Sequence, residues 1–194
     1  MIILGTIASS MKSGLPATYE LITTQTLASN QTTVTFNSIS QAYTDLVIRA
    51  SIRTSRDAQG WDDVKINFNG DTGANYSGRL RWGSNINENQ QAESSTYAVF
   101  RPFLSYSTSP ENNLWDNLEV YIQNYSSTSQ YKTLHGHDGT NYFTSASSSA
   151  VFCNGYVWIN TSAINSISMT QFSSPQTADI ASGSVISLYG IKKA

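Results

Sequence analysis

The chain has 194 residues, a net charge of −2 and only 12% charged residues, about half the share of ~25% found in an average globular domain. This length is typical of a single domain with an ordinary core, and the 11 Lys and Arg residues are dispersed rather than gathered into a basic stripe that would bind nucleic acid. Strong helix formers never run together, whereas Ser, Thr, Asn and Tyr are abundant, which indicates an all-β domain with polar outer faces.

Residues 1–15 are predicted to be an N-terminal arm and linker, followed by a single domain over 16–194. The apolar residues of this arm are Ile2, Ile3, Leu4 and Ile7. No basic residue precedes them, and the stretch is shorter than the roughly 7–15 apolar residues of a signal peptide. No run elsewhere approaches the roughly 18 apolar residues of a membrane helix. We therefore expect a soluble protein that is not evidently secreted, with a short apolar arm.

Period-two alternation of apolar and polar residues recurs along the chain, with turn signals between the segments. The sequence "NGDTG" at 69–73 predicts a turn, and Pro102 places its strand at a sheet edge or a bulge. Residues 151–159 are almost continuously apolar and predict a strand buried on both faces. The predicted strands are 19–27, 32–36, 46–53, 64–69, 80–82, 97–104, 114–123, 131–135, 151–159, 164–169 and 185–189.

These strands, with no convincing helical segment, favour two antiparallel sheets packed face to face. A jelly-roll-like sandwich is the preferred architecture, and another Greek-key sandwich is the alternative. In such folds the first and last strands often lie near each other within a sheet. We therefore predict that the final strand, 185–189, pairs inside a sheet and contributes Val, Ile and Leu to the core.

The strongest hint of chemistry is a pair of histidines. His135 and His137 are two residues apart, so on a strand they share a face, and Asp138 follows them. They are weak candidates for a metal site, because the glutamate that a jelly-roll metal site adds further along is replaced by Asn141 and Tyr142. The alternative is that these polar residues simply lead from a strand into a turn. The sequence has no Gly-x-Ser-x-Gly elbow and no recognisable acid pair, so we expect no enzyme activity, no bound metal and no cofactor.

Three aromatic residues, Trp61, Tyr76 and Trp82, occur in polar, turn-rich sequence. Such rings can stack on sugars, but they can also close the ends of a sandwich core with their N–H or O–H groups satisfied at the rim. We favour the second interpretation and keep weak glycan contact as the alternative. The one cysteine, Cys153, lies among apolar residues and is predicted to act as a small buried hydrophobe.

Five segments of the chain stand out when they are taken together and in order. They are "LPATYELITTQTLAS", "YTDLVIRASIR", "FNGDTGANYSGR", "SAINSISM" and "SGSVISLYGIKKA". In this order they resemble a group of virion structural proteins from tailed bacteriophages, particularly phages of cyanobacteria and other aquatic bacteria. The resemblance covers most of 16–194 and is weakest over 85–149. The group is similar in lacking a catalytic motif.

The resemblance implies a structural role in the virion, with the protein made in the host cytoplasm. As a capsid decoration or cement protein it would form a homotrimer on the capsid surface and bind the major capsid protein, with the arm mediating contacts to the shell or between copies. As a tail or fibre module it would instead touch host glycan through its loop aromatics. A metal-binding enzyme built on the two histidines is the third alternative. We expect neither nucleic acid nor membrane as a partner.

Overall fold

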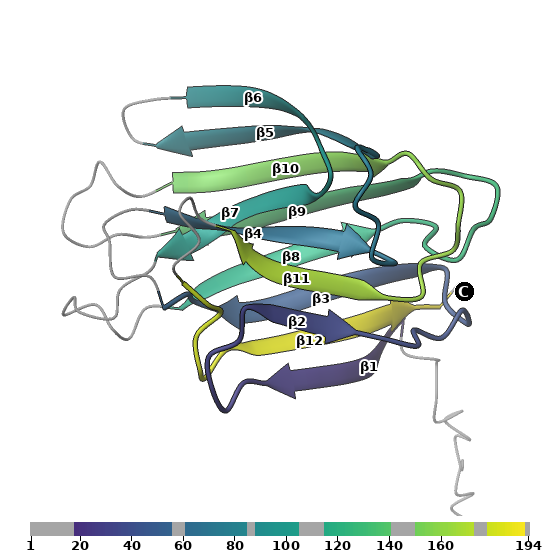
Figure 1. Ribbon diagram of the computed structural model, residues 1–194, viewed down its shortest axis with the longest axis horizontal. Helices are drawn as coiled ribbons and strands as arrows, with labels where there is room; N and C mark the ends of the chain where they lie inside the picture. Colours follow the sequence, from purple (N-terminus) through teal and green to yellow (C-terminus); the bar gives the residue numbers. More distant parts are fainter. Residues whose placement is uncertain are drawn as a thin grey trace, which may run out of the picture.

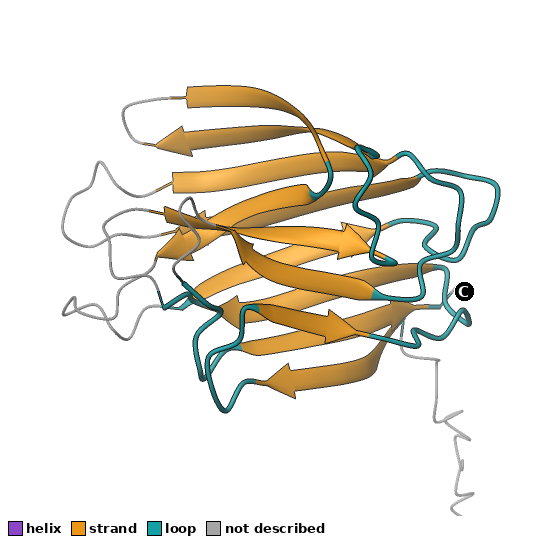
Figure 2. Cartoon of the chain, in the orientation of Figure 1, coloured by secondary structure: helices purple, strands orange, loops and turns teal. Residues whose placement is uncertain are grey.

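The computed structural model describes residues 18–55, 61–84, 88–104, 115–140, 150–172 and 178–192. Within these ranges all regular secondary structure is β, as predicted (Figure 2), and no helix has the length and apolarity needed to cross a membrane. The predicted arm residues Ile2, Ile3, Leu4 and Ile7 lie outside the described residues. The strands are β1 (Tyr19–Thr26), β2 (Thr33–Phe36), β3 (Asp45–Ile52), β4 (Trp61–Phe68), β5 (Tyr76–Ser84), β6 (Glu88–Ser95), β7 (Ala98–Leu104), β8 (Asp116–Ile122), β9 (Lys132–Thr140), β10 (Ala150–Trp158), β11 (Ile167–Phe172) and β12 (Val185–Ile191).

The strands form two antiparallel sheets in two layers (Figure 1). The large sheet has the order β1-β12-β3-β8-β9-β10-β5-β6, and the small sheet has the order β2-β11-β4-β7. The predicted two-sheet sandwich is therefore confirmed.

The pairing of the strands is nested, which is the topology of a jelly roll. The pairs β1 with β12, β2 with β11, β3 with β8, and β4 with β7 are all antiparallel. The chain thus behaves as one long two-stranded ribbon wrapped across both sheets. Two hairpins, β5–β6 and β9–β10, are inserted into this ribbon, and both extend the large sheet beyond β8.

The final strand lies inside the large sheet, as predicted. β12 pairs with β1 on one side and with β3 on the other. Ile186 and Leu188 are fully buried, while Val185 and Tyr189 lie half-buried on the opposite face. At Gly190 an added Cβ would lie 2.3 Å from the ring of Tyr43, so only glycine fits beneath this ring.

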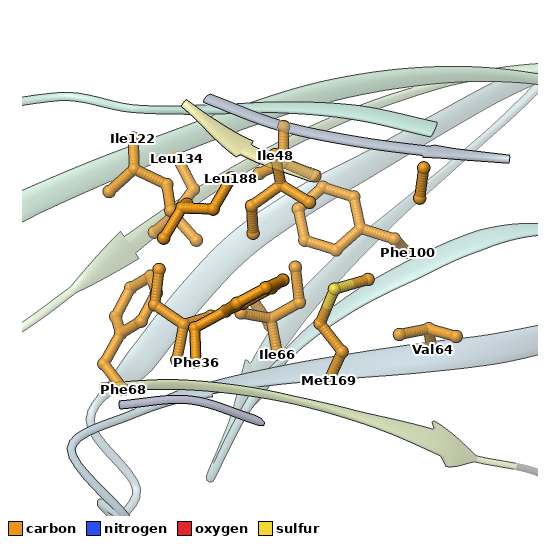
Figure 3. Close-up of a cluster of buried hydrophobic side chains, with 14 of the residues drawn as sticks. Phe36, Ile48, Val64, Ile66, Phe68, Phe100, Ile122, Leu134, Met169 and Leu188 are labelled. Carbon is orange, nitrogen blue, oxygen red and sulfur yellow. The ribbon is translucent and has the colours of Figure 1, made fainter. Parts of the chain in front are cut away.

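Alternate residues of both sheets meet in one core (Figure 3). β4 buries Val64, Ile66 and Phe68, and β8 alternates in the same way, as its sequence predicts. β3 alternates only from Ile48 onward, because its first four residues, 45–48, are all buried. The side chains of the large sheet that face the small one in Figure 3 include those of Ile48, Ile122, Leu134 and Leu188; those facing them include Phe36, Val64, Ile66 and Met169.

Two local predictions are confirmed. Asn69 and Gly70 both have positive φ, 53° and 67°, and the amide of Asp71 donates to the carbonyl of Phe68 at 2.8 Å, which defines the predicted turn. β7, which contains Pro102, is an edge strand of the small sheet, where a missing backbone donor is tolerated.

Two other predictions are wrong. β10 is buried on one face only, because no described strand packs over the outer face of the large sheet at this point: Val151 is 61% exposed. For the same reason Cys153, predicted to be buried, is exposed.

The strand β6 was not predicted at all. Its sequence, "ENQQAESS", has no apolar alternation, and it is a strand because it pairs with β5 along its length.

Candidate functional site

The outer face of the large sheet, opposite the core, is an accessible surface that crosses several described strands. Strand registers place its outward residues in rows that cross the sheet. One row runs across β12, β3, β8, β9, β10 and β5 as Ser187, Arg49, Glu119, His137, Cys153 and Arg81. The neighbouring row runs across the same strands as Tyr189, Val47, Tyr121, His135, Gly155 and Arg79, and of these Val47 is buried.

The β3 side of this face is occupied by a satisfied ion pair. Arg49 Nε lies 2.7 Å from Glu119 Oε2, and this hydrogen bond raises the pKa of Arg49. The guanidinium carbon of Arg49 lies 5.3 Å from the ring centre of Tyr19 and 5.7 Å from that of Tyr189. A shallow groove of about 390 Å³ runs beside the pair and reaches His137. The Arg49 guanidinium is therefore already occupied by contacts within the protein.

Tyr121 is held rigidly in the centre of the face. Its hydroxyl donates to Asp45 Oδ2 at 2.6 Å, and the amide of Asn124 donates to Asp45 Oδ1 at 2.7 Å. Burial and the neighbouring Asp45 carboxylate raise the pKa of Tyr121 to about 12. Its ring lies 5.0 Å, centre to centre, from the ring of His135. Tyr121 therefore supports one wall of the surface beyond it.

His135 and His137 project from the same face of β9, which is the geometry predicted for them. They lie opposite Tyr121 and Glu119 on β8, and opposite Gly155 and Cys153 on β10. Among the side chains that the structure describes, no three His, Cys, Asp or Glu come close enough to hold a metal ion. The side chain of Asp138, the third candidate, lies outside the described residues.

The three predicted glycan-contact aromatics are not brought together. Tyr76 is fully buried and packs beside Phe68 and Trp158, and its hydroxyl oxygen accepts a hydrogen bond from the amide of Phe68 at 2.8 Å. It therefore belongs to the core and cannot contact a glycan. Trp82 is half-buried against Phe152, and the side chain of Trp61 lies outside the described residues.

Asp71, in the turn "NGDTG", is a structural carboxylate. It accepts hydrogen bonds from Trp158 Nε1 at 2.7 Å, from Gly73 N at 2.8 Å and from Asn75 Nδ2 at 2.9 Å. Burial by itself would raise the pKa of Asp71, but these hydrogen bonds outweigh it and lower the pKa. The carboxylate fixes the turn onto the core and is not a candidate acid catalyst.

Lys132 is a fully buried cation that sequence reasoning missed. Its ammonium group donates to the carbonyls of Ser127 at 2.6 Å, Thr161 at 2.7 Å and Gln130 at 3.0 Å. Burial lowers the pKa of Lys132. The side chain joins the loop before β9 to the loop after β10, so its role is structural.

The edge strand β1 is the second accessible surface. Its outward residues Tyr19 and Leu21 are 44% and 53% exposed, and the register shifts between Leu21 and Thr23. Only one side of β1 pairs with another described strand. The backbone groups on its free side can pair with an added strand.

No family model matches this chain, and no curated protein matches it either.

Proposed function

We propose that the protein is a non-enzymatic structural protein of a tailed-bacteriophage virion, a capsid decoration protein that binds the major capsid protein and stabilises the shell. The observation that supports this most is the nested jelly-roll pairing, an architecture that viral capsid domains use. Lectins and cupins use it as well, and a fold does not by itself define a function. The choice among these rests on the ordered segments that resemble phage virion proteins.

Three charged groups that are held by hydrogen bonds support a structural role. Lys132, Asp71 and Asp45 are each held by several hydrogen bonds that fasten loops or strand ends to the sandwich. These groups have the fixed geometry of scaffold residues. A metal-binding enzyme gains no support from the described side chains.

The free side of β1 is the surface proposed for assembly. It combines backbone groups that pair with no other described strand with the exposed Tyr19 and Leu21. An extended segment of the shell or of another copy would add to this edge and cover both side chains. Assembly as a homotrimer over junctions of the shell is part of the proposal.

Deleting Met1–Ser10 is expected to weaken incorporation into particles while leaving the sandwich intact. The first described strand begins only at Tyr19, so thermal melting of the truncated protein should match that of the full chain. The measurement is the occupancy of the variant on purified particles, relative to the full chain. A control chain with Ile2, Ile3, Leu4 and Ile7 changed to Ser tests whether the apolar side chains matter or only the length. Normal occupancy of both variants would refute a role for the arm.

A tail or fibre module that contacts host glycan is the alternative function. It is favoured by the shallow grooves on the outer face of the large sheet. The number of copies per particle separates the two functions. The copy number of a decoration protein is set by the number of shell subunits, whereas that of a fibre module is set by the single tail and is small.

A further inference from the structure

The part of the outer face formed by β9, β10 and β5 contains two adjoining rows with the same arrangement of side chains. In each row a histidine on β9 and an arginine on β5 lie on either side of a small residue on β10, and these three strands lie side by side in Figure 1. Since neighbouring strands are about 4.8 Å apart, the histidines and arginines stand roughly 10 Å from each other across a low floor. We call this surface the basic trough; its rows are His135–Gly155–Arg79 and His137–Cys153–Arg81.

The floor of the basic trough is open. A Cβ atom added at Gly155 would meet no heavy atom within 4 Å beyond the adjacent residues. A groove of about 690 Å³ lies here, lined by Arg79, His135 and Gly155 together with hydroxyl-bearing residues such as Ser94 and Thr133. This volume falls within the range of roughly 300–1,000 Å³ found for small-ligand sites.

The arginines of the basic trough have no polar partner among the described residues. Arg79 and Arg81 are exposed, and within the described part of the chain neither forms an ion pair or a hydrogen bond. Arg49, on the same face, is by contrast paired with Glu119. The guanidinium fork of a free arginine matches a carboxylate and can donate two parallel hydrogen bonds to it.

The lining favours a saccharide over a peptide. Protein partners are usually anchored by large apolar or aromatic side chains in a pocket. The accessible apolar residues of the described lining, Ala92 and Val157, are small. The ring of His135, tilted against that of Tyr121 at 5.0 Å between centres, forms one wall. The hydroxyl of Ser94 can exchange hydrogen bonds with those of a sugar, and the hydroxyl of Thr133, which donates to Gln123 Oε1 at 3.1 Å, can accept one.

We propose that the basic trough binds an acidic saccharide, with its carboxylates held by Arg79 and Arg81 and a sugar ring over Gly155. This binding site goes beyond the proposed virion role, since both a capsid-surface protein and a tail module can carry it.

Calorimetry on the purified full chain tests the proposal with two acidic probes, tetragalacturonate and tetramannuronate, and with neutral galactotetraose. The full chain should bind at least one acidic probe and bind the neutral one at least tenfold more weakly. R79Q removes one guanidinium and should weaken binding about tenfold or more. G155V fills the floor without changing charge and should do the same. R49Q, which removes an equal charge from the same face, should leave the affinity within about twofold.

G155V is a sound steric test because valine suits a strand and the space above Gly155 is empty. Thermal melting of each variant verifies its fold. The proposal would be overturned if the full chain bound neither acidic probe, if it bound the neutral probe equally well, or if R79Q and G155V both kept full affinity. Tighter binding of an oligo-aspartate peptide or of single-stranded DNA would also overturn it. All of these measurements use free protein, so their failure is separate from any failure of the virion role.

Discussion

A chain that ends after Gly183, and so lacks β12, is expected not to fold. β12 pairs with β1 and β3, so its loss breaks two ladders inside the large sheet and detaches β1 from the sandwich. The core also loses Ile186 and Leu188, both fully buried. Truncating one such residue to alanine costs about 2–5 kcal/mol, whereas a whole domain is stable by only about 5–15 kcal/mol. Circular dichroism and thermal melting of the truncated chain provide the measurement.

Two substitutions in β12 give this experiment its controls. L188A removes buried side-chain volume and should lower the free energy of unfolding by about 2–5 kcal/mol while leaving a cooperative transition. S187A alters the outer face, where the Ser187 hydroxyl lies 2.9 Å from that of Thr24, and should change stability by less than about 1 kcal/mol. A cooperative melt in the truncated chain would show that β12 is peripheral, contrary to the nested pairing.

Lys132→Met is expected to have the second largest effect, lowering the free energy of unfolding by about 2–4 kcal/mol. Methionine keeps most of the aliphatic stem, so the loss reports on the ammonium group. Without it, the carbonyls of Ser127, Gln130 and Thr161 lose a charged donor at a buried site. For a domain of this size the melting temperature should fall by roughly 10 °C. Chemical denaturation and calorimetric melting both measure the effect.

An exposed lysine gives the matched control. Lys192 forms an ion pair with Glu20 at the surface, where such pairs contribute little. Lys192→Met should therefore leave stability nearly unchanged although it removes the same charge. Equal stability of the Lys132→Met and wild-type proteins would contradict the role assigned to the buried ammonium.

The strands in which apolar and polar residues clearly alternate could be predicted from the sequence. The segments around Ile48, Ile66 and Val120 alternate because one face packs against the opposite sheet, and the turn at Asn69 and Gly70 has residues that tolerate positive φ. For the nested pairing, only the fold class could be predicted, and the individual strand partners could not. It joins strands far apart in the chain, such as β1 and β12, and no local pattern encodes such a partner.

The errors and omissions share one physical cause, which is that they depend on neighbours from other parts of the chain. β6 is a strand because β5 lies beside it. Val151 is exposed because no strand that the structure describes covers β10 on that side. In the sequence Lys132 is indistinguishable from a surface lysine, and its burial depends on the loop after β10, where Thr161 accepts its hydrogen bond.

The candidate site was accessible to sequence reasoning only in part. The shared face of His135 and His137 follows from strand periodicity. Their neighbours across the sheet, Gly155 and Arg79, follow only from the register of β9, β10 and β5. Tyr76 was a reasonable surface candidate by its polar flanks, yet β5 pairs with β10 in a register that places Tyr76 opposite Trp158, with its ring in the core.

The number of copies of this protein per purified virion tests the virion role most directly. Quantitative mass spectrometry of particles, with the major capsid protein as the internal reference, provides that number. The proposed role predicts a copy number that follows the major capsid protein in a fixed ratio, with the protein retained on particles that have lost their tails. Absence of the protein from purified particles, or a few copies that disappear together with the tail, would contradict it.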